Sequence, residues 1–174
     1  MKKAILTVAL LATVGAASAQ GLSAGWSYGS FGDRMTDKTE HMAVLQSDDR
    51  SSQGFDKVVL QCVAGKPDSA TAHFMTSRTY LGSDGIRYAY RLDSAEVVND
   101  VANNSIYNQA VAGNKKGVKV ASGKNAVELA KKLSTVKSIS TTVNTFEGRI
   151  FSGNFDNVQV RVDKLQSWIS ACGA

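Results

Sequence analysis

Apolar and polar residues alternate along most of this chain, a pattern typical of β-strands with one buried face. Residues 57–64 and 86–93 show it most clearly. In the first segment Val58, Leu60 and Cys62 share the apolar face, so this cysteine is predicted to point into the core. The second segment is predicted to bury its own apolar set, which is Ile86, Tyr88, Tyr90 and Leu92.

Shorter stretches of the same pattern predict further strands, at residues 40–46, 70–79, 106–112, 118–121, 138–144 and 149–155. Gly82-Ser83-Asp84-Gly85 is a turn signal that joins the 70–79 strand to the next one. A link of hairpin length separates the last two strands. The glycine-rich segment 21–35 is predicted to be a first, irregular strand, and residues 47–55 and 94–105 to be polar loops.

Two segments change to helical spacing, residues 125–133 and 157–171. The first opens with Asn125 and Glu128 in the form of a capping box, in which each side chain serves an unpaired backbone amide. Asp156, or the first residue itself, is predicted to cap the second helix. Apolar positions in this second segment recur at intervals of four and three residues and form one stripe, which is Val158, Val162, Leu165, Ile169 and Cys172.

The two cysteines of the chain, Cys62 and Cys172, are predicted to form a disulfide. Cys62 lies on the buried face of a strand and Cys172 ends the buried stripe of the last helix, so both thiols point toward the core. The bond would close a loop of about 110 residues, for which loop entropy gives at most roughly 4–5 kcal/mol of stabilisation. The alternatives are a redox pair, which normally has Cys-x-x-Cys spacing, and a zinc site, which needs more clustered ligands.

Residues 1–19 have the pattern of a secretory signal peptide. Lys2 and Lys3 give a positive start, an uncharged and mostly apolar run follows, and the segment ends in Ala17-Ser18-Ala19. We expect cleavage after this segment, leaving residues 20–174 as one periplasmic domain that does not insert stably in a membrane. The alternative is an uncleaved anchor, but the apolar run is shorter than the about 20 residues that a spanning helix needs.

Charge gives little indication of a partner. The formal net charge of +5 falls to +3 when the two leader lysines are removed. The remaining lysines are spread out, with the densest group between residues 115 and 132. Such lysines usually form a solvated face and less often mark an anionic partner. Because the protein is expected to be exported, nucleic acid is not an expected partner.

Motifs of catalytic and metal sites are weak in this sequence. Neither Gly-x-Ser-x-Gly nor His-Glu-x-x-His occurs. Ser134 and Lys137 match Ser-x-x-Lys, but the serine lies at the end of a predicted helix rather than at its start, and the partner motifs are missing. His41 and His73 lie in separate predicted strands, and the acidic loops lack a calcium-loop pattern. We therefore expect no catalytic residue, metal or cofactor.

Arg87, Arg91 and Asp93 are predicted to form a polar row along one face of the 86–93 strand. Two interpretations stay open. The row is a recognition surface, since guanidinium groups suit carboxylate or phosphate partners, or it is the solvent-facing side of an antiparallel sheet. The three residues are the candidate binding surface of this chain.

Several short elements along the chain resemble the VasI/TagO family of periplasmic proteins, which is associated with type VI secretion and has members outside secretion loci. The elements are Trp26, Met35-Thr36-Asp37, His41-Met42-Ala43-Val44-Leu45, Val59-Leu60-Gln61-Cys62, Tyr90-Arg91-Leu92-Asp93, Phe151-Ser152-Gly153-Asn154-Phe155 and Cys172. The chain departs from the family pattern after Asp93, where members often have a tryptophan. The resemblance implies a β-rich periplasmic protein with an accessory, non-catalytic function.

Together these observations predict a mainly β (α+β) fold, an antiparallel β-sandwich-like domain with two helices, the last tied to a core strand by Cys62–Cys172. The expected function is that of a non-catalytic periplasmic accessory protein that binds an envelope or secretion-apparatus protein during assembly of a type VI secretion apparatus. One alternative is a prophage- or host-encoded envelope protein that acts in superinfection exclusion or receptor modulation. A cell-wall hydrolase is a third hypothesis.

Overall fold

The structure is a computed structural model that describes residues 24–33, 38–49, 53–77, 81, 85–102, 106–108, 115–145 and 147–173. The predicted signal peptide, residues 1–19, lies outside this set. Most of the predicted 82–85 turn and residues 109–112 of a predicted strand also lie outside it. The described residues form two antiparallel sheets and two helices.

Six strands form the larger sheet, and every pairing in it is antiparallel. Strands β1 to β4 are neighbours in chain order, and the chain returns to this sheet later with β8 and β7. In spatial order the strands are β1 (Gly25–Asp33), β2 (Lys38–Gln46), β3 (Lys57–Val63), β4 (Lys66–Thr76), β8 (Lys115–Ser122) and β7 (Ile106–Asn108).

Four strands form the smaller sheet, again with antiparallel pairings only. Two pairs that are adjacent in sequence, β5 with β6 and β9 with β10, are joined through the pairing of β5 with β9. In spatial order the strands are β10 (Ile150–Phe155), β9 (Ile139–Asn144), β5 (Ile86–Leu92) and β6 (Val98–Ala102). The edge strands of this sheet are therefore β10 and β6.

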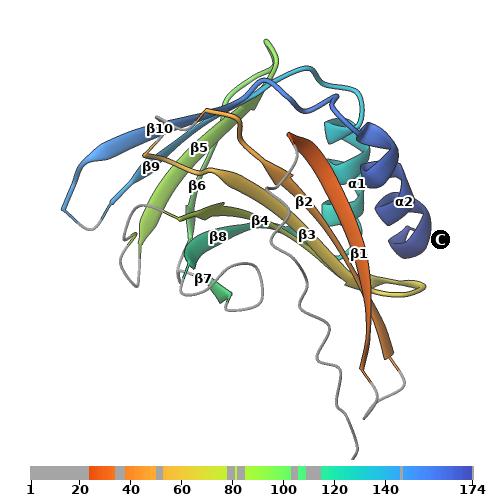
Figure 1. The fold of residues 1–174 in the computed structure, drawn as a ribbon. Coiled ribbons are helices and arrows are strands. Elements are labelled where there is room, and N and C mark those ends of the chain that lie inside the picture. Colours follow the sequence, from red (N-terminus) through yellow and green to blue (C-terminus); the bar gives the residue numbers. More distant parts are fainter. Residues whose placement is uncertain are drawn as a thin grey trace, which may run out of the picture.

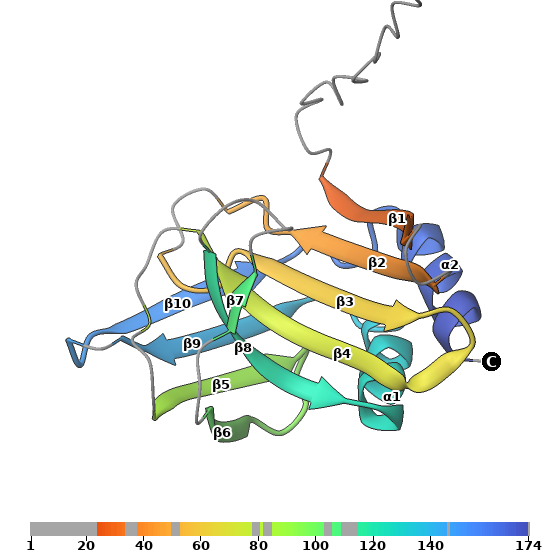
Figure 2. The same cartoon turned by 90° about the horizontal axis from the view of Figure 1, so that it is seen from below.

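Both helices pack on the same side of the larger sheet as the smaller sheet does (Figures 1 and 2). Helix α1 (Lys124–Leu133) lies against β4 and β8, and α2 (Val162–Cys172) lies against β1 and β2. The helices thus cover one part of the inner face of the larger sheet, and the smaller sheet covers another part. The predicted fold, a mainly β antiparallel sandwich with two helices, is confirmed.

Alternation within the strands builds the core between these layers. Side chains from both sheets and both helices meet there, and Trp26 and Trp168 are fully buried among them. The predicted inner faces of β3 and β5 are confirmed, because their residues belong to the core or pack against it: Val58, Leu60, Cys62, Ile86, Tyr88, Tyr90 and Leu92.

The glycine of the Phe-x-Gly-x-Phe element allows a close approach of two chain segments. Gly153 lies on the inner face of β10, where the backbone of Phe55 crosses it. A Cβ atom on Gly153 would collide with the carbonyl oxygen of Phe55. Gly54 faces the backbone of Ser152 in the same way. Only residues without a side chain permit this contact, which holds the segment before β3 against the smaller sheet.

The prediction of a polar loop over residues 94–105 is wrong, because β6 lies within it. The error has a physical reason. β6 is an edge strand, and four of its five residues are exposed. A strand that buries neither face shows no alternation of apolar and polar residues, so the pattern that indicates strands is missing here. Backbone pairing with β5 holds the strand instead.

The predicted starts of both helices are also wrong. α1 begins at Lys124 after Gly123, whose φ of 57° and backbone hydrogen bond to Ala70 set the turn, and no side chain caps it. Asn125 therefore lies inside the first turn and not at the cap. α2 begins at Val162 instead of residue 157. The preceding turn is fixed by Trp26, whose indole and backbone N–H groups donate to the carbonyl oxygens of residues 158 and 160.

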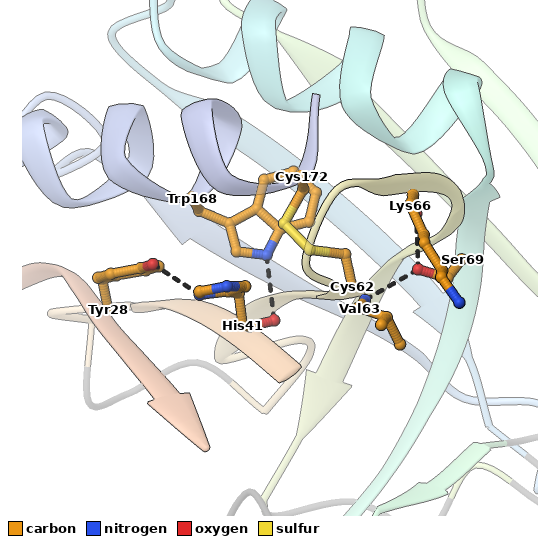
Figure 3. Close-up of a disulfide and its surroundings, with 8 residues drawn as sticks. All are labelled: Tyr28, His41, Cys62, Val63, Lys66, Ser69, Trp168 and Cys172. Atoms are coloured by element: carbon orange, nitrogen blue, oxygen red, sulfur yellow. Dashed lines mark hydrogen bonds between the residues drawn. A yellow bond between two sulfur atoms is a disulfide. The ribbon is translucent and has the colours of Figure 1, made fainter. Parts of the chain in front are cut away.

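The predicted disulfide is present and joins Cys62 of β3 to Cys172 of α2 (Figure 3). Both residues are buried, and their Cα atoms are 5.9 Å apart. Trp168 lies on the same helix beside the bond, and its indole N–H donates to the carbonyl oxygen of His41 at 3.3 Å. The end of the last helix is therefore attached to the larger sheet by a covalent bond and by a neighbouring hydrogen bond.

Candidate functional site

The outer face of the smaller sheet carries two arginines among short polar side chains. In antiparallel strands, residues that pair directly lie on the same face. The registers of β5 with its two neighbours and of β9 with β10 therefore define this surface, which we call the arginine face. Its residues are Arg87, Ala89, Arg91, Asn99, Val101, Ser140, Thr142, Asn144, Ile150, Ser152 and Asn154.

The same alternation that fills the core leaves this face polar. Ile139, Thr141 and Val143 of β9 are buried, so Ser140, Thr142 and Asn144 point the other way. In the described residues, no helix or strand covers them (Figure 1). The centre of the face is small and hydrophilic, and its large apolar side chains lie at the corners, where Val101 and Ile150 are exposed.

Arg87 and Arg91 project from β5 near two ends of the arginine face. They are four positions apart, which corresponds to about 13–14 Å along an extended strand. Both are exposed, and in the described part of the chain neither forms an ion pair. Among these described residues no carboxylate is paired with either guanidinium group, and each can receive an anionic group from outside.

Two shallow hollows lie on the arginine face. One, of about 340 Å³, is lined on its outer side by Arg87, Asn99, Thr142 and Asn144. The other, of about 300 Å³, has Arg91, Val97, Ser140, Ser152 and Asn154 in its lining. Each hollow therefore combines one guanidinium group with hydroxyl or amide groups.

Asp100 borders the first hollow, but it lies on the inner side of the sheet together with Tyr88. It pairs directly with Tyr88, whose hydroxyl donates to the carboxylate at 3.0 Å. The backbone N–H of Val101 donates to its other oxygen at 2.7 Å. Burial of Tyr88, followed by this hydrogen bond and the charge of Asp100, raises the pKa of the tyrosine. The carboxylate thus has partners of its own on the inner side.

Asp93, the third predicted surface residue, lies beyond the end of β5 and is not in the row of the two arginines. Its backbone has a left-handed conformation with φ of 50°. Its carboxylate accepts hydrogen bonds from the backbone N–H groups of Lys137 and Ser138, at 2.9 and 2.8 Å. The structure therefore brings Arg87 and Arg91 together on one face and gives Asp93 a position where it fixes the start of β9.

Replacing Asp93 with alanine should lower the melting temperature at neutral pH. The hydrogen bonds from Ser138 and Lys137 lower the pKa of this carboxyl, so its charged form is favoured by folding. The contribution is present above the unfolded-state pKa and is lost as the pH falls through the folded-state pKa. The difference in thermal unfolding between wild type and variant should therefore be larger at pH 7 than below the folded-state pKa, which is lowered from 3.8, and the part that remains at low pH is the cost of alanine at a left-handed φ. A difference that persists unchanged at low pH would contradict this role.

A groove lies on another side of the molecule, between α1, β8 and the turn from β5 to β6. It has a volume of about 790 Å³. Its floor consists of apolar side chains at the margin of the core, and charged residues such as Glu96 and Lys132 line its rim. An apolar floor with a polar rim is typical of sites for small amphipathic molecules. The floor residues are Tyr90, Leu92, Val120, Ala121, Leu129 and Val136.

The two histidines lie on different strands of the larger sheet. His41 is half-buried, and its Nδ1 atom forms a hydrogen bond with the hydroxyl of Tyr28 at 2.7 Å (Figure 3). His73 is buried in β4 and pairs directly with Lys119 of β8. Burial, and then the charge of Lys119, lowers the pKa of His73 to about 4.

This shift predicts acid destabilisation between pH 6.5 and 4. The unfolded chain takes up a proton at His73 near pH 6.5, whereas the folded chain does so near pH 4, so stability falls as the pH drops through this window. The loss amounts to roughly 3 kcal/mol at pH 4. Urea unfolding from pH 4 to 7 measures it. His73→Gln should flatten the dependence, and His41→Gln is the control that should leave the His73 contribution in place.

The Ser-x-x-Lys match is divided between a helix end and a loop. Ser134 follows α1, and its hydroxyl donates to the carbonyl oxygen of Lys131 at 2.7 Å. Lys137 is exposed, and its backbone N–H donates to Asp93.

Within the described residues, no group of three or more His, Cys, Asp or Glu side chains is arranged to hold a metal ion. No helix in that part of the chain is long and apolar enough to cross a membrane.

Sequence reasoning identified the two arginines but missed the hydroxyl and amide residues around them. Their signal was the alternation in residues 138–144 and 149–155, which places Thr142 and Ser152 on the polar side of their strands. That signal assigns a face within each strand, but it does not show that β9 lies beside β5. The composition of the arginine face therefore depends on the strand order.

No protein-family model and no curated protein matches this sequence. Among solved structures, the chain is similar to the crystal structure of invasion associated protein B from Bartonella henselae. The TM-score is 0.46 with 8% sequence identity, over 83% of this chain and 92% of the other. A similarity at this level carries no argument about function.

Proposed function

We propose that this protein is a non-catalytic binding protein that acts outside the cytoplasm and recognises another envelope component through the arginine face. The observation that carries the proposal is the uncovered outer face of the smaller sheet, on which Arg87 and Arg91 have no ion-pair partner among the described residues. Charged groups of this kind, held on a rigid sheet, provide specificity and orientation for a partner.

The proposed compartment is the periplasm. The Cys62–Cys172 disulfide supports it, because structural disulfides persist in oxidising compartments and are rare in the cytosol. The signal-peptide pattern of residues 1–19 supports it independently. Mass spectrometry of the periplasmic fraction tests both points, since the expected species begins at residue 20 and has no free thiol. A full-length or reduced species in that fraction would contradict the proposal.

A narrower function is proposed from the sequence resemblance to the VasI/TagO family, which is assistance in assembling an envelope-spanning type VI secretion apparatus. In that case deletion of the gene should impair assembly of the apparatus, and secretion structural genes should lie beside it. Phage genes in that position would favour the alternative, a prophage-encoded protein that modulates a surface receptor.

Site-specific photocrosslinking tests the binding role of the arginine face. Ala89 lies between the two arginines on β5, and a photoreactive residue placed there should give a defined adduct in the intact envelope. The same residue at Lys66, which is exposed at the start of β4, is the positional control. The Arg87→Glu/Arg91→Glu variant should abolish the adduct at residue 89. An adduct that persists in this variant, or that forms equally from residue 66, would contradict the proposal.

A further inference from the structure

We propose that the envelope component recognised by the arginine face is an acidic polysaccharide, that is, a glycan chain that carries carboxylate or phosphate groups. This inference rests on the proposed function, because it names the chemical class of the ligand for the same face. The charge of the face, its hydrogen-bonding chemistry and its small polar centre each support it.

The arginine face carries two positive charges, and none of its eleven residues is acidic. Asp100 borders the hollow of Arg87 and accepts hydrogen bonds from Tyr88 and Val101, so the face together with this border keeps a net positive charge. A guanidinium group presents a planar set of N–H donors that fits a carboxylate or phosphate with two parallel hydrogen bonds. Two such groups about 13–14 Å apart on one strand suit a ligand with anionic groups repeated along its length.

Hydroxyl and amide side chains occupy the space between and beside the arginines. Ser140, Thr142 and Asn154 belong to two adjacent strands and point outward. Such groups both donate and accept hydrogen bonds. Sugar hydroxyls have the same dual character, so a polyhydroxylated chain can pair with this surface at many points. The arginines would bind its acidic groups, and the neutral side chains would bind its hydroxyls.

The residues at the centre of the face favour a polysaccharide over a folded protein. A stable protein interface has aromatic or large apolar residues at its centre. Here the centre is Ala89 with polar neighbours. A second copy of this chain, bound through the same face, would place its arginines opposite these arginines, and like charges repel.

Binding to immobilised polymers of known composition tests the inference. The purified, disulfide-bonded protein is tested against polygalacturonate, phosphorylated dextran, neutral dextran and polyglutamate. We expect binding to an acidic polysaccharide that is at least about tenfold tighter than binding to dextran or polyglutamate. Added salt should weaken it, because the contacts of the arginines are charge-assisted and solvent-exposed.

Three variants locate the site. Arg87→Glu/Arg91→Glu should reduce affinity for the acidic polysaccharide at least about tenfold. The control Lys66→Glu/Lys124→Glu makes the same change in net charge at exposed positions outside the face, and it should change affinity less than about twofold. Thr142→Val removes one exposed hydroxyl at nearly constant volume, and we expect a loss of about two- to tenfold.

Three results would overturn the inference. Equal or tighter binding of polyglutamate would identify an acidic protein as the ligand, and absence of binding to both acidic polysaccharides would exclude the proposed class. An equal loss in the lysine control would show a general charge effect without a site. In each of these cases an adduct at residue 89 that depends on the arginines would leave the proposed binding function standing, so the two proposals fail separately.

Discussion

Removal of the disulfide in the variant Cys62→Ala/Cys172→Ala lowers the free energy of unfolding by up to about 4–5 kcal/mol. The bond joins residues that are 110 positions apart, and without it the unfolded chain gains the conformational freedom of that whole loop. The folded state also loses buried sulfur atoms, since both cysteines lie in the core. For a protein of ordinary stability this loss approaches the total free energy of folding.

Urea unfolding followed by circular dichroism measures this effect. Wild type treated with a reductant is the matched control, because it keeps both side chains and breaks only the link. Reduced wild type and the double variant should have similar transition midpoints, both well below that of the oxidised protein. A free energy of unfolding for the double variant within about 1 kcal/mol of that of the oxidised wild type would show that the bond contributes little.

The second large effect is expected at Trp26, which joins the first strand to the segment before α2. Its side chain is fully buried, and its indole N–H donates to the carbonyl oxygen of Val158 at 2.8 Å. Its backbone N–H donates to the carbonyl oxygen of Val160 at 3.0 Å. Trp26→Ala should cost about 3–5 kcal/mol, because it leaves a cavity and removes a hydrogen bond from a buried acceptor.

Trp26→Phe separates these two contributions. Phenylalanine fills much of the volume but cannot donate to Val158, so we expect a smaller loss of about 1–3 kcal/mol. Trp168→Phe is the comparison, since that indole N–H makes a longer hydrogen bond, 3.3 Å, to His41. Unfolding should be followed by far-ultraviolet circular dichroism, because the substitutions change the fluorescence. Equal stability of wild type and Trp26→Ala would contradict this role for the side chain.

Both predictions concern how α2 and the segment before it are attached, and neither involves the arginine face. The helices lie against the larger sheet, whereas the arginine face belongs to the smaller one. The face itself is held by the pairing of β5 with β9 and by core residues beneath it such as Tyr88 and Val143. Substitutions of Arg87 and Arg91 on the exposed side should therefore change binding with little change in stability.

Much of the fold follows from local patterns in the sequence. The period of two in β3 and β5 identified their buried faces, and the stripe of α2 identified the position of Cys172. These patterns are visible because burial selects apolar residues at regular intervals. Local patterns failed where burial is absent, as in β6, or where a distant residue decides the geometry, as Trp26 does before α2.

The sequence by itself determined the buried faces of β3 and β5, that the two cysteines meet, and that Arg87 and Arg91 share an outward face. Only the tertiary structure decided that β5 lies between β6 and β9, and hence which hydroxyl and amide groups surround the arginines. It also separated Asp93 from them, since the strand ends before that residue. Alternation is a property of one strand, whereas strand order results from the packing of the whole chain, which no short segment encodes.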